Sequence, residues 1–237
     1  DAEPTIGDVV MAARGVSLRD AAGTLRLDDV TLDLRAGEIV GIAGVAGNGQ
    51  SELLAVLAGL ETPQSGVVEV AGRVIDAAHP TDPREMRALG VAHVPEDRRR
   101  EGLVLPFEMS ENSVLGYLRH ARGARRWFLR RSRMVERCSD LMERFDVRPA
   151  NPALPASGFS GGNQQKLVIA REHGAEPKVM LVGQPTRGVD IGAIEFIHRQ
   201  LLDLRDQGCA ILIVSVELDE ILALSDRIVA MNAGRIV

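Results

Sequence analysis

Short apolar runs alternate with segments of helical spacing along most of this chain. Glu38–Ala43, Val179–Val182 and Ala210–Ser215 are apolar runs of the length of a buried strand. Ser51–Leu60 and Ile191–Gln207 repeat apolar residues at the spacing of one helix face. Strands that alternate with helices predict an α/β fold, in which a mostly parallel sheet is covered by helices.

Antiparallel strands are predicted at both ends of the chain. Val9–Ser17 and Val30–Leu34 are predicted strands joined through the polar turn Arg19–Gly23. Ile228–Met231 and Arg235–Val237 are typical of a closing hairpin. Two shorter elements complete the prediction, namely strands within Gly66–Ile75 and a helix over Leu218–Leu224.

The middle of the chain has a different pattern. From Asp97 to about Pro155 charges are dense, strand signals disappear, and helical spacing such as that of Met134–Phe145 takes over. The sequence therefore predicts a helical subdomain inserted into the α/β core. Phe145 and Phe196 lie on apolar helix faces and are expected in the core. The predicted division is a linker at residues 1–8, a core at 9–96 and 156–237, and a helical subdomain at 97–155.

Composition narrows the class of protein. Hydrophobic residues make up 45% of the 237 residues, enough for a substantial core, and the net charge of -5 gives no reason to expect nucleic acid as a partner. Cys138 and Cys209 are isolated, as expected of free thiols in a reducing compartment. No apolar run reaches the roughly 18 residues of a membrane-spanning helix, and no signal peptide is recognised, so we expect a cytoplasmic protein. The first eight residues are typical of an inter-domain linker, which indicates a piece of a longer polypeptide or, alternatively, a processed terminus.

A glycine-rich loop follows the predicted strand that ends at Ala43. Gly44–Ser51 has the spacing of a phosphate-binding loop, G-x-x-x-x-G-K-[ST], with Gln50 in place of the lysine. Its glycines let backbone amides surround phosphate oxygens at a helix N-terminus, and Ser51 stands where a hydroxyl ligates Mg²⁺. A glycine-rich turn without a ligand is the alternative, because the lysine is the most diagnostic residue of the motif. The candidate nucleotide-binding residues are Gly44, Gly47, Asn48, Gly49, Gln50, Ser51 and Glu52.

A second glycine turn lies farther along the chain. Phe159–Gln165 reads Phe-Ser-Gly-Gly-Asn-Gln-Gln and precedes an amphipathic helix predicted over Gln165–Arg171. A serine followed by two glycines at a helix start can form another cradle for an anion. The candidate residues of this turn are Ser160, Gly161, Gly162, Asn163 and Gln164.

Two further segments complete a recognisable order of motifs. Val179–Asp190 is an apolar strand followed by Gly-Gln-Pro-Thr-Arg-Gly-Val-Asp, and Val214–Glu217 ends another apolar strand. In this order the four segments resemble the phosphate loop, signature loop, Walker B strand with D-loop, and switch strand of ABC transporter ATP-binding domains. The strings Gly-Val-Ala-Gly-Asn-Gly-Gln-Ser-Glu, Gln-Pro-Thr-Arg-Gly-Val-Asp and Glu-Leu-Asp-Glu resemble, more narrowly, the second, C-terminal domain of bacterial simple-sugar and nucleoside importer ATPases.

This resemblance covers Val9–Val237 and implies an ABC-type P-loop NTPase core with an inserted helical subdomain, and ATP with Mg²⁺ as ligands. In this family two such domains pair head to tail, and each ATP lies between one phosphate loop and the signature loop of the other domain. The D-loop residues Gly188 and Asp190 and the signature turn are retained, so the chain is expected to complete its partner's site.

The resemblance also marks what the chain's own site lacks. Gly183 and Gln184 stand where the family carries the aspartate that helps to hold Mg²⁺ and the carboxylate that polarises water, and Val216 replaces the switch histidine. Neither Gly nor Gln acts as a general base, so the isolated domain is expected to be inactive or very weak. Glu96 stands at the position of the Q-loop glutamine. Arg19 is a candidate for stacking on adenine, where the family carries an aromatic ring.

The resemblance implies a subunit domain of an importer for simple sugars or nucleosides, peripheral at the cytoplasmic face of the bacterial membrane. Its expected partners are a first ATP-binding domain of the same polypeptide, membrane permease subunits and, indirectly, a substrate-binding protein. Two other functions stay open: a scaffold domain of the same transporter that binds no nucleotide, and a soluble ABC protein acting on nucleic acid, which the missing lysine and carboxylates disfavour.

An arginine cluster surrounds Trp127–Phe128 in the predicted helical subdomain. Basic patches with aromatic residues can bind nucleic acid or anionic lipid, whereas a solvated helix face beside one hydrophobic anchor is the simpler interpretation. The cluster comprises Arg119, Arg122, Arg125, Arg126, Arg130, Arg131 and Arg133.

Overall fold

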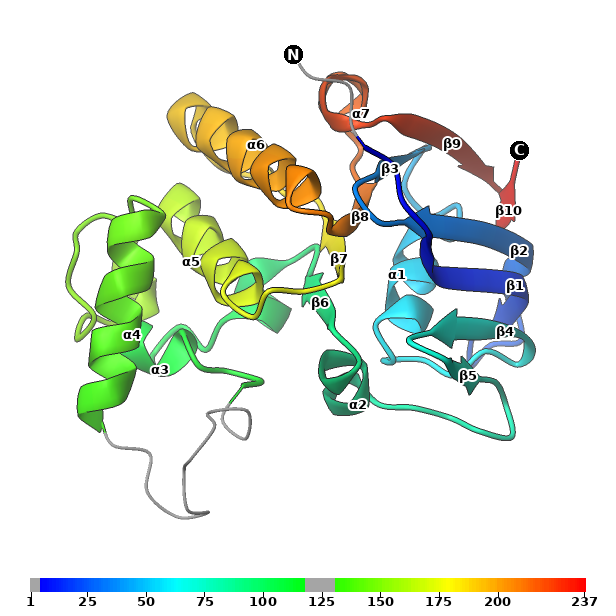
Figure 1. Ribbon diagram of the computed structural model, residues 1–237, viewed down its shortest axis with the longest axis horizontal. Coiled ribbons are helices and arrows are strands. Elements are labelled where there is room, and N and C mark those ends of the chain that lie inside the picture. The colour runs from blue at the N-terminus through cyan, green and yellow to red at the C-terminus, as the bar shows by residue number, and fades with distance from the viewer. Residues whose placement is uncertain (1–4, 118–130) are drawn as a thin grey trace. The chain divides into compact units, whose positions relative to one another are not determined.

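The computed structural model describes residues 5–117 and 131–237 and has the predicted α/β fold (Figure 1). It divides into two compact units. The first unit comprises the described residues up to Glu96, Glu176–Pro185 and His198–Val237, and the second comprises the described residues of Asp97–Ala175 and Thr186–Ile197. Among the described residues, no helix is long and apolar enough to cross a membrane.

A six-stranded sheet of order β10-β9-β3-β8-β7-β6 forms the centre of the first unit. Its strands are β3 (Ile39–Ala43), β6 (Val91–Val94), β7 (Val179–Gly183), β8 (Ala210–Val214), β9 (Arg227–Asn232) and β10 (Arg235–Ile236). Neighbouring strands are parallel except β9 and β10, which form the predicted hairpin. Every residue of β7 and β8 is buried, as expected of parallel strands that are covered on both faces.

A second sheet of the first unit has four antiparallel strands in the order β2-β1-β4-β5. These strands are β1 (Val9–Arg19), β2 (Leu25–Arg35), β4 (Ser65–Val70) and β5 (Arg73–Ile75). The strand predicted at Val30–Leu34 is therefore the second half of a longer one. Its first half contains Asp29, whose φ is 54°, and the register with β1 shifts there, which interrupts the alternation of apolar and polar residues.

The helices of the first unit are α1 (Gln50–Leu57), α2 (Pro83–Ala88), α7 (Leu218–Leu224) and the C-terminal part of α6 (Ile191–Asp206). The prediction that the first helix reaches Leu60 is wrong. Gly59 has a left-handed φ of 75°, which ends the helix, and Leu60 is 54% exposed. Neither α2 nor β6 is predicted from the sequence, although Asp82 caps α2 by accepting a hydrogen bond of 2.8 Å from the Glu85 N–H.

The second unit is helical. Its elements are a π-helical turn η1 (Arg98–Gly102), α3 (Met109–Asn112), α4 (Arg131–Arg144), a 3-10 turn η2 (Ala156–Gly158), α5 (Gly161–His173) and the N-terminal part of α6. α5 begins four residues before its predicted start, because Ser160 caps it. Residues 156–175, which the sequence analysis assigns to the core, lie in this unit, where α5 contacts α4.

The aromatic residues of the second unit pack around α5. Phe145 is buried and contacts Phe196 edge-on, with 6.1 Å between ring centroids. Phe196 is only half-buried, contrary to the expected core position, and the Lys166 ammonium lies 4.6 Å from its ring centroid. The Lys166 ammonium therefore lies over a ring that the apolar core leaves partly open.

Candidate functional site

The loop between β3 and α1 has the backbone of an anion cradle. Gly47 and Gly49 have left-handed φ values of 90° and 103°, which glycine adopts without strain. Ser51 is exposed on the first turn of α1, whose first amides have no acceptor within the helix. Glu52 is half-buried, with its carboxylate 4.0 Å from the Arg26 guanidinium.

Asn48 attaches this loop to the hairpin of β9 and β10. Its side-chain oxygen accepts a hydrogen bond of 2.8 Å from the Ala233 N–H, and its backbone oxygen accepts one of 3.0 Å from the Gly234 N–H. Its side-chain amide donates to the Val45 oxygen at 2.9 Å. Asn48 therefore has a structural role that holds the loop in place.

Gln50 is folded into the loop that it belongs to. Its side chain is 4% exposed, its Oε1 accepts a hydrogen bond of 3.1 Å from the Asn48 N–H, and its Nε2 donates to the Val45 oxygen at 3.1 Å. A Cβ at Gly44 would lie 2.5 Å from Gln50 Nε2, so only glycine leaves room for this conformation. The Gln50 amide thus occupies one N–H of the glycine-rich loop, and it adds no positive charge.

The other residues predicted for this site follow the carboxyl ends of β6, β7 and β8. Gln184 has a left-handed φ of 48°, and its side-chain oxygen accepts a hydrogen bond of 3.2 Å from the Val216 N–H. Val216 is 53% exposed, and Gly183 is buried beside Glu96. The amide of Gln184 therefore holds the backbone of the loop after β8 and provides no base. We refer to the loop Gly44–Glu52 with Glu96, Gly183, Gln184 and Val216 as the first half-site.

Arg19, the candidate for stacking on adenine, is held in the turn between β1 and β2. Its guanidinium donates to the Gly23 oxygen at 2.9 Å, and its backbone N–H donates to Gln64 Oε1 at 2.9 Å. Arg19 is an exposed residue, as stacking on a ligand requires.

The turn before α5 lies in the second unit. Ser160 Oγ accepts hydrogen bonds from the Asn163 side-chain amide at 2.9 Å and from its backbone N–H at 3.4 Å. The Asn163 oxygen accepts a hydrogen bond of 2.7 Å from the Arg148 N–H, and Gln164 Nε2 donates to the oxygens of Ala156 and Phe159. These bonds hold the turn rigid, and the amides of the two glycines in the first turn of α5 have no helical acceptor.

Both glycines of this turn are in close contact with a second loop. A Cβ at Gly161 would lie 2.6 Å from the Gly188 oxygen, and one at Gly162 would lie 2.9 Å from Asp190 Oδ2. Asp190 caps α6 by accepting a hydrogen bond of 3.0 Å from the Ala193 N–H. We refer to Ser160–Gln164 with Gly188 and Asp190 as the second half-site.

Arg98, which is not among the residues predicted from the sequence, lies against the second half-site. Its guanidinium donates to the Arg187 oxygen at 2.6 Å and to the Gly188 oxygen at 3.3 Å, and it lies against Gly161. Burial lowers the pKa of Arg98 from its ordinary value, and the charge of Arg99 acts in the same direction. In the sequence Arg98 is one of three consecutive arginines, so nothing distinguishes it from a solvated charge run.

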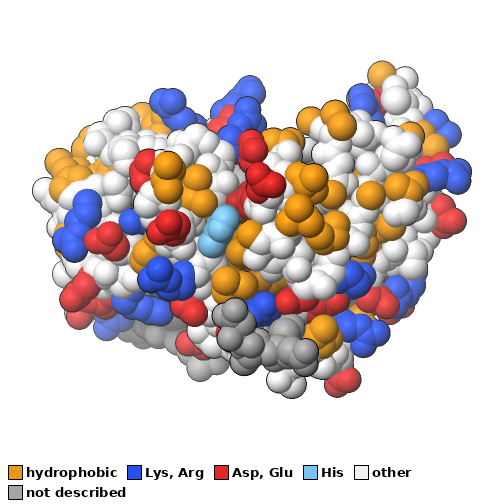
Figure 2. Space-filling view, turned by 90° about the horizontal axis from the view of Figure 1, so that it is seen from above, with side chains coloured by type: hydrophobic (Ala, Val, Ile, Leu, Met, Phe, Trp, Pro, Cys, Tyr) orange, Lys and Arg blue, Asp and Glu red, His pale blue; other side chains and the backbone are white. Residues whose placement is uncertain are grey.

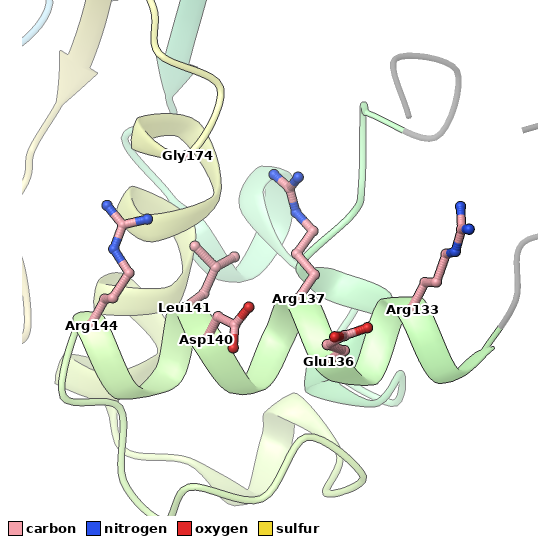
Figure 3. A pocket seen from close by; sticks show the side chains of 7 residues that line it. All are labelled: Arg133, Glu136, Arg137, Asp140, Leu141, Arg144 and Gly174. Atoms are coloured by element: carbon pink, nitrogen blue, oxygen red, sulfur yellow. The ribbon is translucent and has the colours of Figure 1, made fainter. Parts of the chain in front are cut away.

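Most of the predicted arginine cluster lies outside the described residues. Of its members, Arg131 pairs with Glu108 at 2.5 Å, and Arg133 lines a shallow pocket along α4. Figure 3 shows Arg133, Arg137 and Arg144 extending from the same side of α4, with the acidic Glu136 and Asp140 between them. Acidic and basic side chains are also interspersed over the face drawn in Figure 2. The described part of the cluster is therefore a helix face of mixed charge.

The remaining candidates for chemistry are structural. Cys138 and Cys209 are buried free thiols, and burial raises their pKa values to about 11 and about 12, which keeps both protonated near neutral pH. Within the described ranges no group of three or more His, Cys, Asp or Glu residues is arranged to hold a metal ion.

Solved structures share this fold. A nucleotide-free ATP-binding cassette from an ABC transporter matches with a TM-score of 0.82 over 97% of this chain and 90% of that chain, at 22% identity. A dimeric ATP-binding cassette in a post-hydrolysis state, bound to ADP and Pi, also matches with a TM-score of 0.82, over 95% of this chain and 96% of that chain, at 23% identity. The fold is that of an ATP-binding cassette.

Residues 27–187 match the family model of the ABC transporter, and the chain belongs to this family. It is 44% identical over 229 residues to the nucleoside import ATP-binding protein NupA of Lactococcus lactis subsp. cremoris. The aligned residues make up 97% of this chain and 45% of that protein. It is 41% identical over 230 residues to the ribose import ATP-binding protein RbsA 2 of Rubrobacter xylanophilus, covering 97% of this chain and 42% of that protein. The chain spans less than half the length of these relatives.

Proposed function

We propose that this chain is one of two ATP-binding domains of an importer for simple sugars or nucleosides. In this proposal the second half-site completes the ATP site of the partner domain, while the first half-site binds nucleotide without hydrolysing it. The observation that carries the proposal is the contrast between the two glycine turns: the Gln50 side chain is folded into the first, whereas Gly161 and Gly162 of the second carry no side chain of their own.

The first half-site lacks the groups that hydrolysis requires. Phosphoryl transfer needs positive charge at the β- and γ-phosphates and a group that orients the attacking water. Gln50 is neutral, and the side-chain oxygen of Gln184 already accepts the Val216 N–H. Backbone amides and the exposed Ser51 hydroxyl remain, which supports binding of ATP and a divalent cation without turnover.

The second half-site retains what a partner's nucleotide requires. The first-turn amides of α5 lie at the positive end of a helix of 13 residues, which favours a bound phosphate. Ser160 is exposed at the start of this helix. Asp190 and Gly188 lie beside the same turn. A γ-phosphate held on the partner's phosphate loop would meet the backbone amides of a turn whose two glycines carry no side chain.

The proposed partners follow from the length of the relatives and from their printed names. Because the chain spans less than half of proteins named as nucleoside and ribose import ATP-binding proteins, a first ATP-binding domain in the same polypeptide is the proposed partner. Membrane permease subunits and a substrate-binding protein would complete the importer, with this domain peripheral at the cytoplasmic face of the bacterial membrane.

The test is the ATPase activity of the partner domain with and without this chain. We expect a clear rise on pairing, and we expect Ser160→Arg to abolish it, since a long cation at the start of α5 blocks the anion-binding turn. Ser139→Arg is the matched control, because Ser139 is exposed on α4 and its hydroxyl donates to the Val135 oxygen of its own helix. Absence of a rise, or a rise that Ser160→Arg leaves intact, contradicts the proposal.

A scaffold that binds no nucleotide is the second candidate, and the inward hydrogen bonds of Gln50 favour it. Calorimetry of ATP with Mg²⁺ on this chain separates the two functions. Saturable binding without turnover supports a binding site, and no heat at millimolar ATP supports the scaffold.

A further inference from the structure

A buried ion pair lies near the C-terminal end of α5, the helix that begins at the second half-site. Arg171 and Glu172 are 4% and 0% exposed, and Arg171 Nε donates to Glu172 Oε1 at 2.9 Å. The hydroxyl of Tyr117, the single tyrosine of the chain, donates to Glu172 Oε2 at 2.5 Å. A buried ion pair contributes little to stability by itself, because desolvation of the two charges offsets their attraction. The pair is therefore better explained by what it holds in place.

The guanidinium of Arg171 also holds two backbone segments that precede α5 in the chain. Its Nη1 donates to the Gly102 oxygen at 2.8 Å and to the Asn112 oxygen at 3.2 Å. Gly102 is the last residue of η1, and Asn112 is the last residue of α3. The buried side chain of Asn112 in turn donates to the Val104 and Phe107 oxygens. The segment from η1 to α3 is therefore fixed to α5 through Arg171.

The other end of η1 lies against the second half-site. Arg98 is the first residue of η1 and lies against Gly161. Its guanidinium donates to the Arg187 and Gly188 oxygens. Gly161 and Arg171 are ten residues apart on α5, which corresponds to about 15 Å along the helix. η1 thus connects the start of α5 with a point near its end, and π-helical turns, which are rare, are frequent at functional sites.

We propose that Arg171, Glu172 and Tyr117 are positioning residues of the second half-site, which act through η1. The ion pair fixes the last residue of η1 and thereby fixes where Arg98 holds the loop beside Gly161. With the pair intact, the turn at the start of α5 and the neighbouring loop keep the geometry that a partner's phosphate requires. The inference rests on the proposed function in one respect, namely that the second half-site serves the ATP of a partner domain.

Tyr117→Phe is the mildest test of this network, because it removes one hydroxyl and keeps the ring. We expect the maximal ATPase rate of the stimulated partner to fall by about fivefold, since Glu172 loses a hydrogen bond, while the KM for ATP stays unchanged. Ser113→Ala is the matched control, because it removes a buried hydroxyl of the same segment that donates to the Ser110 oxygen at 2.7 Å. A rate equal to that with Ser113→Ala, or a change confined to KM, overturns the inference.

Hydrogen exchange in the 237-residue chain tests the inference without a partner. Arg171→Lys keeps the charge of the ion pair but loses the fork that reaches the Gly102 and Asn112 oxygens. We expect the amides of η1 and of the loop 187–189 to exchange at least about fivefold faster, while those of β8 keep their rates. Tyr117→Phe should act in the same direction to a lesser extent. Unchanged exchange in η1 and the loop, or equally faster exchange in β8, overturns the inference.

Failure of this inference and failure of the proposed function are distinguishable. If the wild-type chain gives no rise in partner ATPase, the proposed function fails, and hydrogen exchange still decides whether the ion pair positions η1. If the chain stimulates its partner while Tyr117→Phe and Arg171→Lys change neither the rate nor the exchange, only the inference fails.

Discussion

The two half-sites are built on the same device, a glycine turn at the start of a helix, and differ in where their polar groups point. In the first, the Gln50 side chain turns back and accepts a hydrogen bond from the loop's own Asn48 N–H. In the second, Ser160 and Asn163 bond to each other beside the turn, and Gly161 and Gly162 place no side chain over it. The comparison teaches that the backbone amides of a glycine turn stay available to an anion when the stabilising side chains bond beside the turn. Fewer of these amides are available when a side chain of the turn accepts from one of them.

The largest expected loss of partner ATPase stimulation is for a substitution at Gly161. Gly161→Ala places a Cβ 2.6 Å from the Gly188 oxygen, a backbone atom, so the turn and the neighbouring loop have to separate. We expect stimulation of the partner's ATPase to fall by at least roughly tenfold, since overpacking costs about 1–3 kcal/mol. Gly158→Ala is the matched control, because no atom of the described residues beyond its chain neighbours lies within 4 Å of its Cβ position. Equal rates for the two variants would show that the second half-site tolerates a side chain.

Substitution of Arg98 is expected to cause the next largest loss of partner ATPase stimulation. Arg98→Ala removes the donors to the Arg187 and Gly188 oxygens and frees the loop that lies beside Gly161. Charged hydrogen bonds contribute about 1.5–3 kcal/mol, so we expect roughly a tenfold loss of stimulation. The loss should be in kcat, with the KM of the partner for ATP little changed, because Arg98 positions the turn. Arg98→Lys should recover part of the rate, and Arg99→Ala, an exposed neighbour, should match wild type; an unaltered rate in Arg98→Ala contradicts the role.

Substitution of Gln50 tests the first half-site, through its affinity for ATP. Gln50→Met keeps the length of the side chain and frees the Asn48 N–H, so ATP binding to the first half-site should tighten by about fivefold, the value of one neutral hydrogen bond. Gln50→Lys should tighten it further by adding charge at the phosphates. Calorimetry measures both, with Gln200→Met on α6 as the control for the substitution. Weaker binding by Gln50→Met would mean that Gln50 is a ligand of the nucleotide.

Much of the fold could be predicted from the sequence, because buried parallel strands leave a simple pattern. β7 and β8 are apolar throughout and buried throughout, and α7 has its predicted bounds. The errors occur where one backbone conformation decides the outcome. Gly59 ends α1 before Leu60 by adopting a left-handed φ, and a single sequence does not tell such a glycine from one inside a helix.

The candidate site was predictable as a set of residue types but not as a set of contacts. The glycines and the missing lysine can be read directly from Gly44–Ser51. The packing of Glu96 on Gly183 joins residues far apart in the chain, and Arg98 acts through two backbone oxygens that carry no sequence signal. Such contacts depend on tertiary placement, which local periodicity does not contain.

The smallest expected effect is on the labelling rates of the two buried thiols, one in each unit. Because the thiolate is the reactive form and burial raises the pKa values of Cys138 and Cys209 to about 11 and about 12, native thiols react only when their surroundings open. Because the folded state keeps both thiols protonated, their contribution to the free energy of unfolding is fully present below the ordinary thiol pKa. This contribution is lost as the pH rises toward 11 to 12. At neutral pH, ATP with Mg²⁺ at twice its Kd for the first half-site should slow the labelling of Cys209, in the first unit, by about threefold. Labelling of Cys138, in the second unit, should not change, as Cys138→Ala and Cys209→Ala single-thiol variants would report. Equal slowing of both thiols would mean that the units open together and that the half-sites are not independent.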